Sequence, residues 1–258
     1  MPASPDTRQP AAPEHTSLSP PPIPAAGDAL LLDFDGTLVE IADTPDGIRV
    51  PAELPELLAR LSEKLEGRLA IVSGRAVADL EKHLGRLPVA LMGSHGGEMR
   101  DAGASAISAL VDPLPQAAVD ALHDLAEEQG GLLVERKPCG AAIHFRARPE
   151  AEAAVRKRAQ DIAENHDLKH KAGKMVSELV VRGADKGAGL RHLLALPRFA
   201  GARAIFAGDD VTDEDAFQVA SDYGDGGGIL VGPPRETAAR WHLSGPPAVQ
   251  EWLKETLA

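Results

Sequence analysis

Residues 30–38 read LLLDFDGTL, three leucines followed by two aspartates at alternate positions. A run of apolar residues bounded by a turn predicts a short buried strand of a parallel sheet. Side chains alternate along a strand, so Asp33 and Asp35 point to one side and Phe34 to the other. Gly36 then permits a tight turn. Carboxylates at the carboxyl end of such a strand lie where open α/β sheets bind ligands.

A simpler interpretation of this stretch is an acidic turn that ends the strand. Two carboxylates on the same side of a strand repel each other and are costly to bury, however. A bound cation would resolve that conflict. We therefore favour a functional site at Asp33 and Asp35.

Composition limits the classes of protein that the chain can belong to. It has 258 residues, a formal net charge of −12 and a single cysteine, Cys139. The negative charge argues against a nucleic-acid partner, and no apolar run is long enough to predict a membrane partner. A single cysteine excludes an intrachain disulfide and fits a reducing compartment, so we expect a cytoplasmic protein.

Residues 1–27 differ in kind from the rest. Eight of the first 24 residues are proline, and neither a basic start nor an apolar segment indicates a signal peptide. We expect residues 1–27 to form a disordered, proline-rich tail.

Apolar strands and amphipathic helices alternate after the first motif. Leucines at helical spacing cover residues 51–65, and an apolar strand at 69–72 runs into Ser73-Gly74-Arg75. Further apolar strands are expected at 89–92 and 204–207. This alternation predicts a doubly wound, Rossmann-like parallel sheet, which places Ser73 at the same edge as Asp33. Ser73 can cap the following helix or bind an anion at its N-terminus, and the two roles are compatible.

The pattern changes from residue 113, where a second, smaller α+β unit is predicted. Helices are expected at 115–129 and 149–165, and strands at 131–137, 141–146 and 175–181. We place an inserted cap at 110–182, which leaves 28–109 and 183–258 as the core. Alternation puts Ala142, His144 and Arg146 on one face of a cap strand, either solvated or lining a site.

The return to the core brings a lysine and a cluster of acids. Lys186 opens a helix, where a cation opposes the macrodipole, and an anion cluster nearby would explain it. Residues 209–215 hold five acids in seven positions after a buried strand. They are either a solvated helix start or, together with Asp33, a magnesium site built from hard oxygen ligands.

These four motifs, in this order, resemble those of the haloacid dehalogenase-like (HAD) phosphatases. The resemblance implies a Rossmann-like parallel-sheet core with an inserted α+β cap. It also implies that Asp33 is the nucleophile and Asp35 the general acid and base, with Ser73 and Lys186 on the phosphate. The acids from Asp209 onward would then hold magnesium.

Two further strings are similar to those of the trehalose-6-phosphate phosphatases. One is GSHGGE at 93–98, where Gly97 replaces the alanine of many relatives. The other is a set of cap residues: Glu135 with Lys137, His144 with Arg146, and Lys174 with Glu178, where Ser177 replaces a usual apolar residue. The resemblance covers about residues 29–256.

The resemblance implies a full set of site residues. Those expected in catalysis are Asp33, Asp35 and Lys186. Those expected to bind substrate are Ser73, Gly74, Arg75, His95, Glu98, Lys137, His144, Arg146, Lys174 and Glu178. Those expected to hold magnesium are Asp33, Asp35, Asp209, Asp210 and Asp213.

We therefore expect a magnesium-dependent phosphatase that converts trehalose 6-phosphate to trehalose and phosphate through an aspartyl-phosphate. The resemblance further implies a role in trehalose biosynthesis, a functional pairing with a trehalose-6-phosphate synthase, and a monomer. Two alternatives stay open: another HAD sugar phosphatase, such as one for sucrose phosphate, or a catalytically silent regulatory domain. Intact Asp33, Asp35, Lys186 and Asp209 argue against the silent domain.

Overall fold

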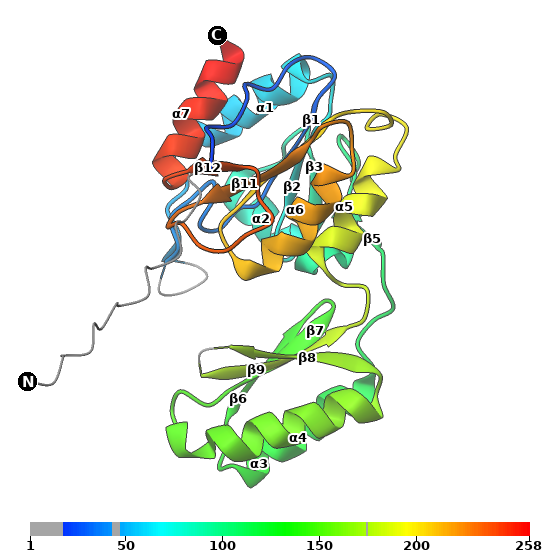
Figure 1. Cartoon of the computed structure of the whole chain (residues 1–258). Helices are drawn as coiled ribbons and strands as arrows, with labels where there is room; N and C mark the ends of the chain where they lie inside the picture. The colour runs from blue at the N-terminus through cyan, green and yellow to red at the C-terminus, as the bar shows by residue number, and fades with distance from the viewer. Residues whose placement is uncertain (1–17, 43–46, 174) are drawn as a thin grey trace, which may run out of the picture.

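A computed structural model describes residues 18–42, 47–173 and 175–258 of the chain. Two sheets organise it (Figure 1). The larger has eight strands in the order β12-β11-β10-β1-β2-β3-β4-β5, and the smaller has four in the order β6-β7-β9-β8. The predicted fold class, a mainly parallel core with a separate α+β cap, is confirmed.

The core sheet is parallel from β12 to β3, and β4 and β5 extend it in the antiparallel sense. Its strands are β1 (Ala29–Leu32), β2 (Leu69–Val72), β3 (Ala90–Gly93), β4 (Glu98–Arg100), β5 (Ser108–Ala109), β10 (Ala204–Gly208), β11 (Gly227–Val231) and β12 (Trp241–Leu243). Every residue of β1, β2, β3, β10 and β11 is buried. The expected apolar strands are thus the centre of the sheet.

Helices cover both faces of this sheet. On one face α1 (Leu54–Lys64), α2 (Val77–Leu84) and α7 (Pro246–Leu257) share an apolar core with alternate residues of β1. On the other face α5 (Lys186–Leu194) and α6 (Glu214–Ser221) pack on the remaining residues, Ala29 and Leu31. This doubly wound arrangement brings Asp33, Ser73 and Asp209 to one edge, because each directly follows a parallel strand.

The described helices of the cap pack on one face of its antiparallel sheet. Its strands are β6 (Leu133–Lys137), β7 (Gly140–His144), β8 (Leu168–Gly173) and β9 (Val176–Val181), and its helices are α3 (Gln116–Glu128) and α4 (Glu152–Asn165). The helices pack on Ala141, Ile143 and Phe145, as alternation predicts. The opposite face of the sheet turns toward the core (Figure 1).

Strand β8 was not predicted, and it pairs with β9 over its whole length. Its sequence, LKHKAG, carries too few apolar residues to be recognised as a strand. The described residues also include the short 3₁₀ segments η2 (Ser94–Gly96), η3 (Pro149–Ala151) and η4 (Val211–Asp213).

Part of the expected disordered tail is held against the core. Residues 1–17 lie outside the described part of the chain, but Ser19 pairs with Trp241 of β12. The indole nitrogen of Trp252 donates a hydrogen bond to the carbonyl of Pro22 at 3.1 Å. For residues 18–27 the expectation of disorder is therefore corrected, because a backbone bridge to β12 and the Trp252 indole hold this segment against the core.

No helix among the described residues is long and apolar enough to cross a membrane.

Candidate active site

Asp33 lies at the centre of a buried network at the end of β1. The ammonium of Lys186 donates to Asp33 Oδ1 at 2.7 Å and to Asp213 Oδ1 at 2.5 Å. The hydroxyl of Thr37 donates to Asp33 Oδ2 at 3.2 Å. Burial lowers the pKa of Lys186, but Asp33 and Asp213 outweigh it and raise the pKa overall. Lys186 therefore stays a cation, and α5 begins with it because Asp185 caps the helix by accepting from Ala188 N.

Asp33, Asp209 and Asp213 form an acidic cluster, with one carboxylate oxygen of each within 4.8 Å of the others. Burial, then Asp213, raises the pKa of Asp209 to about 6. Burial likewise raises the pKa of Asp33, with Lys186 acting in the opposite direction. A divalent cation would relieve this repulsion, and three hard oxygen donors suit magnesium. The residues thus fit the expected metal.

Two of the five expected metal ligands direct their carboxylates elsewhere. Asp210 is the N-cap of η4, accepting from Val211 N at 2.7 Å in a capping box with Asp213. Asp35 accepts two hydrogen bonds from Arg75, at 2.7 Å to Oδ2 and 2.9 Å to Oδ1. Gly36 directly follows Asp35 and packs against Asp209. It must lack a side chain, because a Cβ there would overlap the Asp209 carboxylate.

Arg75, expected to bind substrate, is engaged by two carboxylates. Besides its bidentate pair with Asp35, its Nη1 donates to Asp79 in the first turn of α2 at 2.7 Å. Its guanidinium also lies 5.9 Å from the centre of the Phe34 ring. These contacts fix the guanidinium beside Asp35, the expected general acid.

Ser73 does not cap α2, which settles one alternative left open by the sequence. The N-cap is Ala76, whose side chain cannot accept a hydrogen bond. Ser73 is almost fully buried, and its hydroxyl oxygen accepts from Arg75 N at 3.1 Å. It lines the cleft described below, where an anion could reach it.

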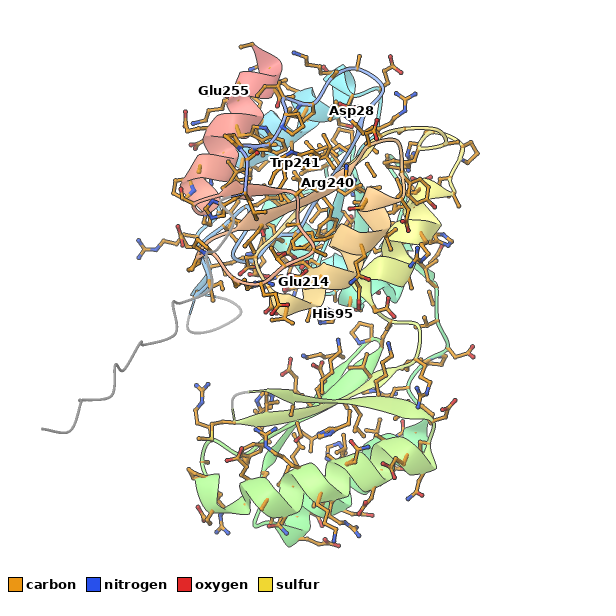
Figure 2. The ribbon with its side chains drawn as sticks, viewed as in Figure 1. Asp28, His95, Glu214, Arg240, Trp241 and Glu255 are labelled. Carbon is orange, nitrogen blue, oxygen red and sulfur yellow. The ribbon has the colours of Figure 1, made fainter. Side chains whose placement is uncertain are left out.

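His95 lies at the edge of the core that faces the cap (Figure 2). Its ring covers Gly74, where an added Cβ would lie 2.7 Å from the imidazole Cε1. Burial, then the charges of Lys171, Lys186 and Lys137, lowers the pKa of His95 to about 3. The imidazole is therefore neutral near pH 7, and its Nδ1 has no hydrogen-bond partner among the described residues.

Glu98 stabilises the loop that carries His95. Its Oε1 accepts from Val77 N at 2.8 Å and from the Ser94 hydroxyl at 3.1 Å. It thereby ties the GSHGGE loop to the start of α2. Glu98 is not among the residues that line the cleft, although it was expected to bind substrate.

The cap contributes a charged surface opposite the core. Strand register places Glu135 and Lys137 on the same face as Glu178. Lys137 Nζ donates to Glu178 Oε1 at 2.8 Å, and His144 Nε2 lies 2.9 Å from Glu135 Oε2. Ser177 faces the other way and contacts His170, so its polar side chain does not alter this surface.

Two of the remaining expected cap residues do not line the cleft, and a third cannot be placed. His144 and Arg146 lie outside the lining of the cleft, and Arg146 follows the end of β7 in an exposed position. Lys174 lies outside the described residues. The strand expected at 175–181 begins one residue later, at Val176, because Met175 has a φ of 60°.

Core and cap together enclose a cleft of about 980 Å³. Its walls include Asp33, Asp35, Ser73, Gly74, Arg75, His95, Lys186, Asp209 and Asp210 from the core, and Glu135, Lys137 and Glu178 from the cap. A nucleophile, an anion site and a polar cap surface thus meet in one space large enough for a small organic ligand.

Two residues of this region were missed from the sequence. Thr37 is fully buried, and its hydroxyl donates a hydrogen bond to Asp33. A hydroxyl residue four positions after Asp33, across the Gly36 turn, was a sequence signal for this contact. Lys171 lies in the strand that was not predicted, and its position depends on pairing with β9. No local pattern indicates that position.

Comparisons with known proteins give a consistent result. A family model described as trehalose-phosphatase matches residues 31–245. A probable trehalose-phosphate phosphatase of Sinorhizobium fredii is 38% identical over 218 residues, 80% of this chain and 78% of that protein. The trehalose-6-phosphate phosphatase of Escherichia coli is 34% identical over 228 residues, covering 88% and 85%.

Solved structures agree with these sequence matches. The C-terminal domain of the Candida albicans trehalose-6-phosphate phosphatase has a TM-score of 0.74 at 27% identity, covering 90% of this chain and 93% of that one. A trehalose-6-phosphate phosphatase related protein has a TM-score of 0.69 at 26% identity, covering 89% and 97%.

Proposed function

The chain belongs to the trehalose-phosphatase family, and we propose that it hydrolyses trehalose 6-phosphate to trehalose and phosphate. The observation that carries this proposal is the pairing of Asp33 with Lys186 at 2.7 Å in a cleft that the charged cap surface closes. Relatives of matching length that carry the name trehalose-6-phosphate phosphatase support the choice of substrate and the role in trehalose biosynthesis.

Asp33 is the nucleophile in this mechanism. Lys186 and Thr37 fix its two oxygens. Burial raises the pKa of Asp33 overall, and the ammonium of Lys186 opposes that effect and favours the ionised carboxylate. An ionised carboxylate can attack phosphorus and form an aspartyl-phosphate, which divides one difficult displacement into two easier ones.

Asp35 transfers the proton. A sugar alkoxide is a poor leaving group, so protonation of its oxygen by Asp35 lowers the barrier of the first step. The carboxylate that results can then take a proton from the water that hydrolyses the aspartyl-phosphate. Arg75 holds both oxygens of Asp35 and so sets its orientation.

Charge on the phosphoryl oxygens is met by Lys186, by the Ser73 hydroxyl and by a divalent cation. Asp33, Asp209 and Asp213 would hold that cation. When bound, magnesium supplies electrostatic stabilisation of the transferring phosphoryl group. Magnesium dependence is thus part of the proposal.

The cap provides recognition of the sugar. Glu135, Lys137 and Glu178 present donors and acceptors to the cleft, and sugar hydroxyls need both. We extend the proposal to the domain limits given above, with residues 110–182 as the specificity cap. Pairing with a trehalose-6-phosphate synthase, a monomeric state and a cytoplasmic location stay predictions.

Phosphate release from a panel of sugar phosphates tests the proposal. Trehalose 6-phosphate, sucrose 6-phosphate and glucose 6-phosphate are compared with magnesium and with a chelator, for the natural chain and for Asp33→Asn. We expect trehalose 6-phosphate to be preferred, chelation to abolish turnover, and Asp33→Asn to lower it to background while the protein stays folded. Faster release from sucrose 6-phosphate would assign a different sugar phosphatase. No release from any ester would assign a silent domain.

A further inference from the structure

Three lysines of the described cap strands lie on the face that turns toward the core. They are Lys137 on β6 and Lys169 and Lys171 on β8, as strand register shows. Lys137 is paired with Glu178 at 2.8 Å, and Lys169 is paired with Asp185 at 3.2 Å. Lys171 has no hydrogen bond or ion pair with any described residue. It is the one lysine of the three whose ammonium has no protein partner within the described residues.

The Lys171 side chain is nonetheless partly removed from solvent. It is half-buried, and burial, more than any neighbouring charge, lowers its pKa. A cation removed from solvent without a partner costs free energy unless something else compensates it. Lys171 is not among the residues that line the cleft, but its ladder partner Glu178 is, so a ligand that reaches past Glu178 would supply that compensation.

The position of Lys171 indicates which part of a ligand it meets. It lies directly opposite Glu178 in the β8–β9 ladder, so the two side chains are adjacent on the sheet. Glu178 lines the cleft, and Lys171 is close enough to His95 to be the largest charge acting on that imidazole. Lys171 thus lies beside the cap carboxylate, and its charge acts on the His95 ring that covers Gly74.

We propose that Lys171 is a substrate-binding residue that contacts hydroxyl oxygens of the phosphosugar, with Glu178 as the neighbouring acceptor. This inference rests on the proposed function and names a specificity residue of the same site. Among the described residues Glu178 bonds Lys137 through Oε1 alone, so its Oε2 can accept, and Lys171 can donate. An adjacent donor and acceptor match neighbouring hydroxyls of a sugar ring. We assign the ammonium to the sugar and not to the phosphate because its ladder partner, Glu178, belongs to the cap surface proposed to recognise the sugar.

The test compares two esters that share only the phosphate. Lys171→Met is assayed on trehalose 6-phosphate and on p-nitrophenyl phosphate, which has no sugar hydroxyls. Loss of one charged hydrogen bond should reduce kcat/KM for trehalose 6-phosphate by about 10- to 100-fold, mainly through KM. Turnover of p-nitrophenyl phosphate should stay within about twofold, and Lys171→Arg should recover part of the loss.

Matched variants and a binding measurement complete the experiment. Lys157→Met removes an exposed lysine of α4 on the far side of the cap and should change neither activity. Glu178→Ala is the positive control for a sugar-specific loss. In an Asp33→Asn background, calorimetry should show weaker binding of trehalose 6-phosphate when Lys171→Met is added.

The outcomes separate this inference from the proposed function. Equal losses on both esters would place Lys171 on the phosphate and overturn the inference, as would no loss on either. If the natural chain prefers another sugar phosphate, the proposed function fails. The inference is then judged on that preferred sugar against p-nitrophenyl phosphate.

Discussion

The orientation of Asp35 depends on Arg75, and the sequence did not reveal this role of the arginine. The sequence placed Arg75 on the substrate, whereas its guanidinium holds both oxygens of Asp35, contacts Asp79 and stacks near Phe34. The bidentate geometry leaves little freedom in where the carboxyl points. Arg75 is therefore a positioning residue for proton transfer.

Arg75→Met should penalise substrates according to their leaving group. A sugar alkoxide needs a proton as it leaves, and p-nitrophenolate does not. We expect about a 100-fold loss of kcat/KM for trehalose 6-phosphate and only a few-fold loss of kcat/KM for p-nitrophenyl phosphate, because this constant reports formation of the aspartyl-phosphate and not its hydrolysis. Arg68→Met, which removes a guanidinium paired with Glu66, is the control and should match the natural chain. Equal losses on the two esters would mean that Arg75 acts on the phosphate.

His95 should make stability depend on pH in a defined window. Its pKa is about 3 in the folded chain, with burial as the main cause, against an ordinary value of 6.5. Between those values the unfolded chain binds more protons, so the free energy of unfolding falls as pH falls. We expect His95→Gln to flatten that fall between pH 6.5 and 4 by up to about 1.4 kcal/mol per pH unit. Parallel curves for the two proteins, measured by urea unfolding, would contradict a buried neutral His95.

Among the elements, the turn between β6 and β7 has a partner in the core. Cys139 on this turn is buried with Val180 and Ala184, and half-buried Val111 packs against them. Val111 and Ala184 belong to the two segments that connect core and cap. A Cβ on Gly97 would overlap the Cys139 sulfur and lie 2.9 Å from its Cβ. The glycine at 97 thus makes room for this thiol.

Gly97→Ala should displace the cap turn, because its Cβ overlaps Cys139. Cys139→Gly should relieve that overlap. We expect the single change at 97 to lower the melting temperature and the kcat/KM, because the cap no longer seats on the core. Adding Cys139→Gly removes both overlapping atoms and should recover part of each loss. A four-member mutant cycle measures the coupling. Additive losses would show that the two residues do not contact each other.

For the molecule as a whole, sequence reasoning succeeded where the topology alone dictates position. Asp33, Ser73 and Asp209 each follow a buried parallel strand, so their meeting at one edge could be predicted. The role of Glu98 could not be predicted, because its contact with Val77 N depends on how the GSHGGE loop folds back on α2. Strand β8 could not either, since its polar residues become a strand only by pairing with β9.

The N-terminal segment was misjudged for the same reason. Its prolines indicate disorder locally, yet residues 18–27 lie against β12 and α7 through distant tryptophans. We expect removal of residues 1–27 to destabilise the fold, contrary to what a disordered tail would do.

Trp252→Phe isolates one of these contacts. It removes the donor to the Pro22 carbonyl, which should cost about 1 kcal/mol and lower the melting temperature by about 2–4 °C. Trp241→Phe is the matched control, since that indole makes no hydrogen bond within the described residues. If the two variants have the same melting temperature, the indole hydrogen bond does not hold the segment.

That Asp33 accepts the phosphoryl group is tested most directly by trapping it. Asp35→Asn is mixed with p-nitrophenyl phosphate, quenched in acid, digested and analysed by mass spectrometry. The good leaving group departs without a proton, whereas hydrolysis of the intermediate lacks its base, so phosphorylated enzyme should accumulate. We predict a hydroxylamine-sensitive phosphoryl group on the peptide that contains Asp33, absent when Asp33→Asn is added. A phosphoryl group on another residue, or turnover of the ester with no phosphorylated enzyme, would contradict this mechanism.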